Sequence, residues 1–134
     1  MAATALEIVQ RSYDYFRATG AFDNGLVSPD YIWDMSTFAG WPEQQVYHGP
    51  EGARQFIAEW TAPFDEWSLE QEEAIEGPDG RVVMISRQHG RHRTTGMPVD
   101  MRLAQVFTVS DGVLVRMQMY ADPDEALAAV GLKA

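Results

Sequence analysis

One carboxylate stands out as a residue that could do chemistry. Asp34 lies in an otherwise apolar stretch, directly between Trp33 and Met35. A carboxylate in apolar surroundings must find a partner or its pKa rises, and a raised pKa suits a general base. The simpler alternative is an aspartate at the edge of a sheet that caps the following loop. The sequence leaves both interpretations open.

A tyrosine and three histidines are the next candidates. Tyr13 lies on the apolar stripe of the first predicted helix, and a buried tyrosine hydroxyl needs a partner, from the protein or from a ligand. The histidines are not at metal-ligand spacing, and the chain has no cysteine; they are His48, His89 and His92. We therefore expect no metal site, no disulfide and no thiolate nucleophile.

Basic residues gather near His89 in a chain that is otherwise acidic; they are Arg87, Arg91 and Arg93. Such a cluster can receive a substrate carboxylate or phosphate. It can also pair with acidic residues on a neighbouring strand, the candidates being Glu70, Glu72 and Glu73. We favour the pairing with these acidic residues.

Local signals place helices at the beginning, middle and end of the chain. Thr4 and Glu7 form a capping-box pattern before apolar residues at helical spacing, and Gly20 suits the left-handed end of that helix. Residues 49–52 open a second helix, with proline where a helix tolerates it. Residues 122–125 combine a cap, a proline and a glutamate, which predicts a short closing helix.

Strand patterns occupy residues 31–35 and, from Trp67 onward, four further segments separated by turn signals. Helices first and an antiparallel run of strands later indicate an α+β fold with helices on one face of a curved sheet. The segment 99–109 is apolar on both faces, so the second face also needs a cover. A partner molecule would supply that cover.

Size and charge limit the classes of function. The 134 residues, of which 46% are apolar, are most simply a single domain over residues 1–134. The net charge of −10 repels nucleic acid and anionic membranes. No apolar run is long enough for a membrane span, and the N-terminus lacks a signal-peptide pattern. We expect a cytoplasmic protein that binds neither nucleic acid nor membrane.

Several motifs together resemble the SnoaL-like proteins, at residues 47–52, 106–112, 120–122 and 125–127. These proteins belong to the superfamily of ketosteroid isomerase, limonene epoxide hydrolase and nuclear transport factor two. The resemblance implies a cone-shaped, cystatin-like α+β barrel, with an antiparallel sheet wrapped around the N-terminal helices. It also implies a hollow cone, so we expect a cavity, and a homodimer that forms through the sheet face.

The resemblance to limonene epoxide hydrolase does not carry over that enzyme's chemistry. The positions that match its catalytic residues hold Ser86, Gln88 and Met119, none of which is a general base. A slip of one residue would offer Arg87 and His89 instead. Epoxide hydrolysis is therefore the less favoured alternative.

The resemblance to ketosteroid isomerase implies a weakened catalytic set. Asp34 falls near the position of the base, and Tyr13 falls at that of the helical tyrosine. Gln105 replaces the protonated aspartate, and its amide can still donate a hydrogen bond to a developing oxyanion. The implied chemistry is cofactor-free isomerisation, cyclisation or dehydration of a small apolar molecule, polyketide-, terpenoid- or steroid-like.

We expect the cone to bind such a molecule, with or without catalysis. The alternative is a non-catalytic ligand-binding or protein-interaction module of the same fold. Thioethers and large rings can shape a mostly apolar cavity, although they also fill ordinary cores. The expected ligand-binding residues are Trp33, Trp60, Met84, Ser86, Gln88, Met101, Met117 and Met119.

Overall fold

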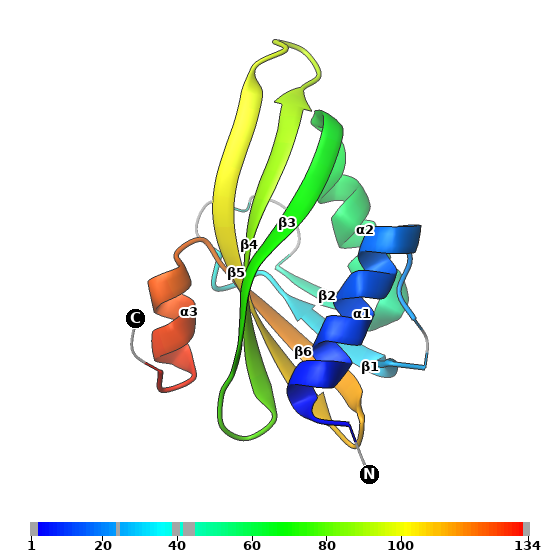
Figure 1. Cartoon of the computed structure of the whole chain (residues 1–134). Coiled ribbons are helices and arrows are strands. Elements are labelled where there is room, and N and C mark those ends of the chain that lie inside the picture. The colour runs from blue at the N-terminus through cyan, green and yellow to red at the C-terminus, as the bar shows by residue number, and fades with distance from the viewer. Residues whose placement is uncertain (1–2, 24, 39–40, 42–44, 133–134) are drawn as a thin grey trace.

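The computed structural model describes residues 3–23, 25–38, 41 and 45–132. A six-stranded curved sheet carries two helices on one side and a third helix on the other (Figure 1). The α+β class is therefore confirmed. The elements are α1 (Ala5–Thr19), β1 (Val27–Asp34), β2 (Val46–His48), α2 (Gly49–Thr61), β3 (Phe64–Glu76), β4 (Arg81–His92), β5 (Pro98–Ser110), β6 (Val113–Tyr120) and α3 (Pro123–Ala129).

The sheet differs from the expected one in two respects. Its strand order is β2-β1-β6-β5-β4-β3, and β1 runs parallel to β6, with Trp33 opposite Met117. The sheet is therefore mixed rather than antiparallel, and it stays open instead of closing into a barrel. The parallel pair joins segments that are far apart in the chain, so no local turn signal in the sequence indicates the relative direction of the two strands.

The predicted helix boundaries agree with the structure. Thr4 and Glu7 form the capping box, and Gly20 ends α1 in the left-handed region with a φ of 74°. The Asp122 side chain accepts a hydrogen bond from the Asp124 N–H at 2.9 Å and so caps α3. None of the described helices is both long and apolar enough to cross a membrane.

A bulge in β3 determines which way its first half faces. Between Asp65 and Ser68 the strand holds one residue more than the opposite segment of β4, and Glu66 adopts a φ of 55°. A bulge adds local twist and re-aims the side chains beside it. The next residue, Trp67, points into the interior of the cone.

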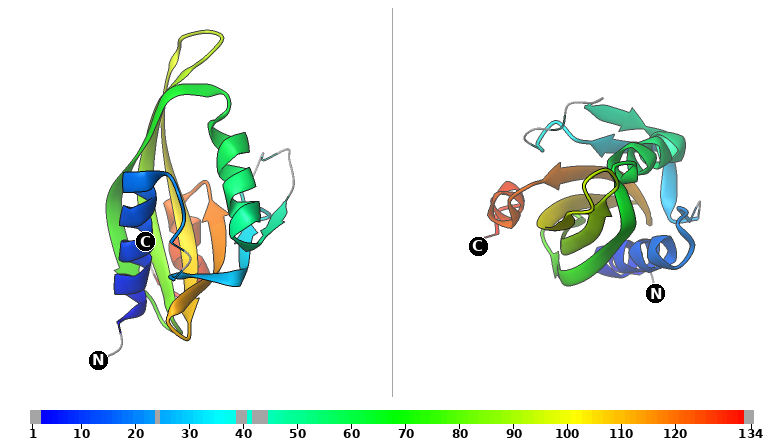
Figure 2. Two further views of the ribbon diagram at one scale, coloured as in Figure 1. Left: turned by 90° about the vertical axis from the view of Figure 1, so that its right-hand side faces the viewer. Right: turned by 90° about the horizontal axis from the view of Figure 1, so that it is seen from above.

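Both faces of the central strands are covered. On the inner face Leu103 and Phe107 pack in the core beneath α1 and α2, whereas Ala104 and Val106 pack on the outer face against α3. Figure 2 shows α3 on the side of the sheet opposite to α1. Helix α3 thus supplies part of the cover for which the sequence predicted a partner, over Ala104 and Val106. The homodimer itself stays a prediction.

Candidate functional site

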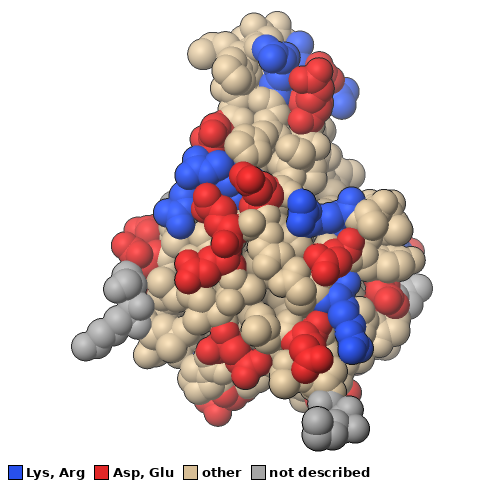
Figure 3. Space-filling view, in the orientation of Figure 1, with Lys and Arg blue, Asp and Glu red and all other residues tan. Residues whose placement is uncertain are grey.

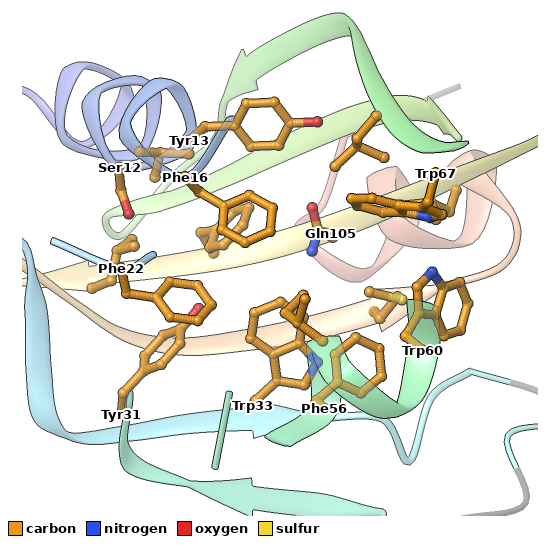
Figure 4. A pocket seen from close by; sticks show the side chains of 17 residues that line it. Ser12, Tyr13, Phe16, Phe22, Tyr31, Trp33, Phe56, Trp60, Trp67 and Gln105 are labelled. Atoms are coloured by element: carbon orange, nitrogen blue, oxygen red, sulfur yellow. The ribbon is translucent and has the colours of Figure 1, made fainter. Parts of the chain in front are cut away.

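A small cavity lies between α1, α2 and the inner face of the sheet (Figure 4). Its volume is about 50 Å³. More than half of the lining residues are aromatic, and within the described part of the chain none of them is charged. The lining consists of Val9, Ser12, Tyr13, Phe16, Phe22, Tyr31, Trp33, Phe56, Ile57, Trp60, Trp67, Leu69, Leu103, Gln105, Phe107, Leu114 and Met119.

Two periodicities bring these side chains together. On β5 every second residue faces the cavity, which selects Leu103, Gln105 and Phe107. On α1 the helical repeat places Val9 and Tyr13 on the face that packs against the sheet. Regular elements supply all the described lining residues except Phe22, which lies in the loop between α1 and β1.

The hydroxyl of Tyr13 is already paired within the protein. It lies 2.7 Å from the Ser86 hydroxyl, which is fully buried on β4. Burial raises the pKa of the Tyr13 phenol, and the hydrogen bond with Ser86 offsets only part of that effect. Tyr13 is consequently a neutral phenol at physiological pH. Ser86 acts behind the cavity wall, as the partner that orients Tyr13.

Gln88 holds two tryptophans at one end of the cavity. Its side-chain oxygen accepts hydrogen bonds from the indole N–H of Trp60 at 2.7 Å and from that of Trp67 at 2.9 Å. A carbonyl oxygen has two lone pairs, so both bonds satisfy the acceptor fully. Gln88 is buried yet does not line the cavity, and it fixes the two rings that do.

Gln105 and Trp33 present polar atoms that the described protein leaves unpaired. The Gln105 side-chain oxygen and the Trp33 indole nitrogen are both buried without a hydrogen-bond partner. In Figure 4 the Gln105 amide projects into the middle of the cavity, between Tyr13 and Phe16 on one side and Trp33 on the other. Tyr31 also lines the cavity, and burial raises the pKa of its phenol strongly.

Asp34 faces away from this cavity. It follows Trp33 on β1, so its side chain points to the opposite face of the sheet, where it pairs with Arg116 at 2.6 Å. It also accepts a hydrogen bond from the Ser36 N–H at 2.8 Å. Burial alone would raise the pKa of this carboxyl, but the bonds from Ser36 and the charge of Arg116 outweigh it and hold the pKa below its usual value. The role of Asp34 as a base stays a prediction.

The expected site residues thus divide into three groups. Tyr13, Gln105, Trp33, Trp60 and Met119 line the cavity. Two residues stand directly behind the lining and hold it by hydrogen bonds, namely Ser86 and Gln88. The remaining residues do not line it, namely Asp34, Met84, Met101 and Met117.

Sequence reasoning missed most of the aromatic wall, including Phe16, Phe22, Tyr31, Phe56 and Trp67. Phe16 and Phe56 were recognisable as members of the apolar helical stripes. Tyr31 shares a strand face with Trp33, since the two residues are separated by one position. For Trp67 the sequence holds no such signal, because its direction depends on the bulge at Glu66.

The basic cluster lies on the outer face of the sheet. Arg87 bonds to Glu72 at 3.3 Å and to Asp100 at 2.7 Å, and Arg102 bonds to Glu72 at 2.7 Å. His89 lies 3.4 Å from Glu70. Figure 3 shows these opposite charges side by side over β3 to β5, left of centre. The expected pairing with acidic residues is therefore observed for Glu70 and Glu72, and the Arg87–His89 alternative for epoxide hydrolysis lies outside the cone.

A model of the SnoaL-like domain matches residues 9–117 of the chain. The chain belongs to the SnoaL-like family. The resemblance stated from the motifs is confirmed, and with it the cone-type fold. A search among curated proteins found no significant match.

Solved structures resemble this SnoaL-like protein in fold over nearly the whole chain. The crystal structure of TerC, co-crystallised with polyporic acid, is 22% identical, with a TM-score of 0.71 and 96% and 98% of the two chains covered. A putative SnoaL-like polyketide cyclase from Jannaschia sp. CCS1 is 22% identical, with a TM-score of 0.67 and 97% and 93% covered. A nuclear-transport-factor-two-like protein from Burkholderia thailandensis E264 is 20% identical, with a TM-score of 0.73 and 96% and 97% covered. At these identities the likeness concerns the fold alone.

Proposed function

We propose that this SnoaL-like protein binds a small, uncharged and largely apolar molecule in the cavity of the cone. The observation that carries the proposal is the cavity's lining, in which aromatic and aliphatic side chains surround a few polar atoms. Concave sites of this composition, with few polar groups that orient the ligand, are the usual small-molecule sites of proteins. The crystal of TerC with polyporic acid supports the idea that this fold takes up organic molecules.

The lining of the cavity favours ligand binding over proton transfer, because its described residues offer no base. Abstraction of a proton needs a base within hydrogen-bond distance of the ligand. Among the described lining residues there is no carboxylate, imidazole or amine. The Gln105 amide can polarise a ligand carbonyl, but Asp34 lies on the other face and is already paired with Arg116. We therefore place ligand binding first and cofactor-free isomerisation, cyclisation or dehydration second.

Tryptophan fluorescence gives a direct test of the proposal. Three of the chain's four tryptophans line the cavity, so a ligand that enters it should change their emission. We would titrate the protein with cyclic ketones, phenols, terpenoid alcohols and fatty acids, and follow each by thermal shift. A ligand at a hundred times its Kd adds about 2.7 kcal/mol to the free energy of unfolding.

Leu103→Phe and Leu127→Phe form a matched pair of controls. The first substitution adds volume in the cavity wall, whereas the second adds it beneath α3 on the outer face. Binding should weaken at least about tenfold in Leu103→Phe and remain in Leu127→Phe, a difference of about 1.4 kcal/mol. If no compound changes the fluorescence or the melting temperature of the wild-type protein, the proposed function is wrong.

A further inference from the structure

The protein leaves two buried polar atoms without partners on the wall of one cavity. The Gln105 oxygen is a hydrogen-bond acceptor, the Trp33 indole N–H is a donor, and neither bonds to the other or to another described residue. Gln105 is 5% exposed and Trp33 is 3% exposed. Buried polar groups are nearly always paired in native proteins, so two orphans on one cavity need an explanation.

Gln88 provides a comparison, because it is a buried glutamine whose oxygen is fully hydrogen-bonded within the protein. Gln88 has the same side chain as Gln105, on the neighbouring strand and on the same face of the sheet, and its oxygen accepts two indole N–H groups. The chain therefore satisfies the Gln88 oxygen internally and leaves the oxygen of Gln105, a residue that lines the cavity, without a described partner. The Gln105 oxygen and the Trp33 indole N–H are therefore the buried polar atoms to which a bound molecule could form hydrogen bonds.

We propose that the cavity selects a neutral, single-ring molecule that carries a hydroxyl group, such as a phenol or a cyclic alcohol. This inference rests on the proposed function and names the class of ligand. A hydroxyl donates one hydrogen bond and accepts others, so it can donate to the Gln105 oxygen and accept from the Trp33 N–H.

Other polar groups fit the two atoms less well. A ketone or ether accepts hydrogen bonds but cannot donate one to the Gln105 oxygen. A carboxylate or ammonium group would enter without a counter-charge, because no described lining residue is charged. Burial of an unpaired charge is far more unfavourable than burial of a hydroxyl. A hydrocarbon would leave both protein atoms unpaired.

The size of the cavity limits the ligand to one ring. Its volume of about 50 Å³ is smaller than the roughly 150 Å³ of an engineered cavity that holds one benzene molecule. A single ring therefore requires small movements of the wall, which long aromatic side chains such as Phe16 and Phe22 can make. Two or more fused rings would require the core to be rebuilt.

Two pairs of isosteric probes test the inference. Phenol and toluene differ in a hydroxyl that donates and accepts, and anisole and ethylbenzene differ in an oxygen that only accepts. We would measure all four Kd values by tryptophan fluorescence in the wild type, Gln105→Met and Trp33→Phe. Because water also solvates the polar probes, the informative quantity is the change between proteins in the ratio of Kd(toluene) to Kd(phenol), and likewise for ethylbenzene and anisole.

The ratio of Kd(toluene) to Kd(phenol), called the phenol ratio, should fall about tenfold in Gln105→Met, which is the effect of one hydrogen bond to a buried group. The ratio of Kd(ethylbenzene) to Kd(anisole), called the anisole ratio, should fall in Trp33→Phe and change little in Gln105→Met. Leu127→Met, an apolar exchange between α3 and the outer face of the sheet, should leave both ratios unchanged. Circular dichroism verifies that each variant is folded, and if one variant does not fold the other still tests its own half of the inference.

Three outcomes separate this inference from the proposed function. A fall of less than about threefold in the phenol ratio for Gln105→Met would overturn the inference while the cavity still binds ligands. Uptake of larger compounds but of none of the four probes would overturn the single-ring class and leave the proposed function standing. If no compound binds at all, both fail.

Discussion

Gln88 and Gln105 are the same side chain in two buried environments, one in which its oxygen is hydrogen-bonded and one in which it is not. Methionine resembles glutamine in length and cannot match its hydrogen bonds, so it separates their roles. Gln88→Met leaves the buried Trp60 N–H unpaired, and we expect the free energy of unfolding to fall by about 1–3 kcal/mol. Gln105→Met removes an amide whose oxygen has no partner among the described residues, and we expect that free energy to stay unchanged or to rise by up to about 1 kcal/mol. Urea unfolding of the three proteins measures both values.

The two substitutions change volume by the same amount, so each is the control for the other. An equal loss in both variants would mean that packing, rather than hydrogen bonding, determines the difference. It would also remove the ground for treating Gln105 as open toward a ligand.

Asp34 makes part of the stability depend on pH. Its pKa in the folded protein is held below the usual value of 3.8, mainly because Ser36 and Arg116 outweigh the effect of burial. The stabilisation is therefore complete above the unfolded-state pKa and is lost as the pH falls through the folded-state pKa. We expect wild type to be more stable than Asp34→Asn at pH 7, with a difference that shrinks below about pH 4. Thermal melts across this range measure it.

The same variant tests whether Asp34 is a base. If Asp34 carries a reaction, Asp34→Asn should abolish turnover and leave the ligand's Kd within about tenfold. Since the carboxyl does not line the cavity, we expect little change in Kd. Normal turnover in this variant would rule out the base.

At the scale of elements, α3 covers the apolar part of the outer face of the sheet. Leu127 packs with Ala126 and Val130 over the outer side chains of β4 and β5. Truncation of a buried leucine leaves a cavity and typically lowers stability by about 2–5 kcal/mol. We expect Leu127→Ala to lower the free energy of unfolding by about 2–3 kcal/mol in urea.

Glu125→Gln on the exposed side of the same helix is the matched control, expected to change stability by less than about 0.5 kcal/mol. A loss below about 1 kcal/mol in Leu127→Ala would mean that α3 contributes little to covering the sheet.

Elements whose signals are local were predictable from the sequence. The capping box at Thr4 and Glu7, the turn at residues 111–112 and the cap at Asp122 each depend on neighbours within a few residues. The parallel pairing of β1 with β6 was not, because strands that are distant in the chain meet without a turn that sets their direction.

The same distinction explains the site. The resemblance to ketosteroid isomerase predicted that Tyr13 and Gln105 belong to the site, and helical and strand periodicity explain why both side chains face the cavity. Asp34 could not be placed, since a shift of one residue in a strand moves a side chain to the opposite face. Trp67 depends on a bulge, where the periodicity of two fails.

At the scale of the whole molecule, the described charged side chains lie outside the cavity. The net charge is −10, and the charged side chains gather on the surface that Figure 3 displays, while none of the described residues lining the cavity is charged. An anionic ligand therefore meets repulsion outside and no counter-charge inside. The protein should discriminate between protonation states of one and the same acid.

Benzoic acid tests this discrimination because it has the size of a single-ring ligand and loses its charge on protonation. If only the neutral acid enters, its apparent Kd should rise about tenfold for each pH unit above the acid's pKa, between about pH 5 and 7. Benzyl alcohol does not titrate in this range, and its Kd should stay constant. Kd values measured by tryptophan fluorescence at several salt concentrations separate two effects. Salt screens the repulsion between benzoate and the surface charges, but it does not change the free-energy cost of burying the carboxylate. A benzoate affinity that is independent of pH would mean that a cationic group reaches the ligand, and the cavity could not then be the uncharged site that we propose.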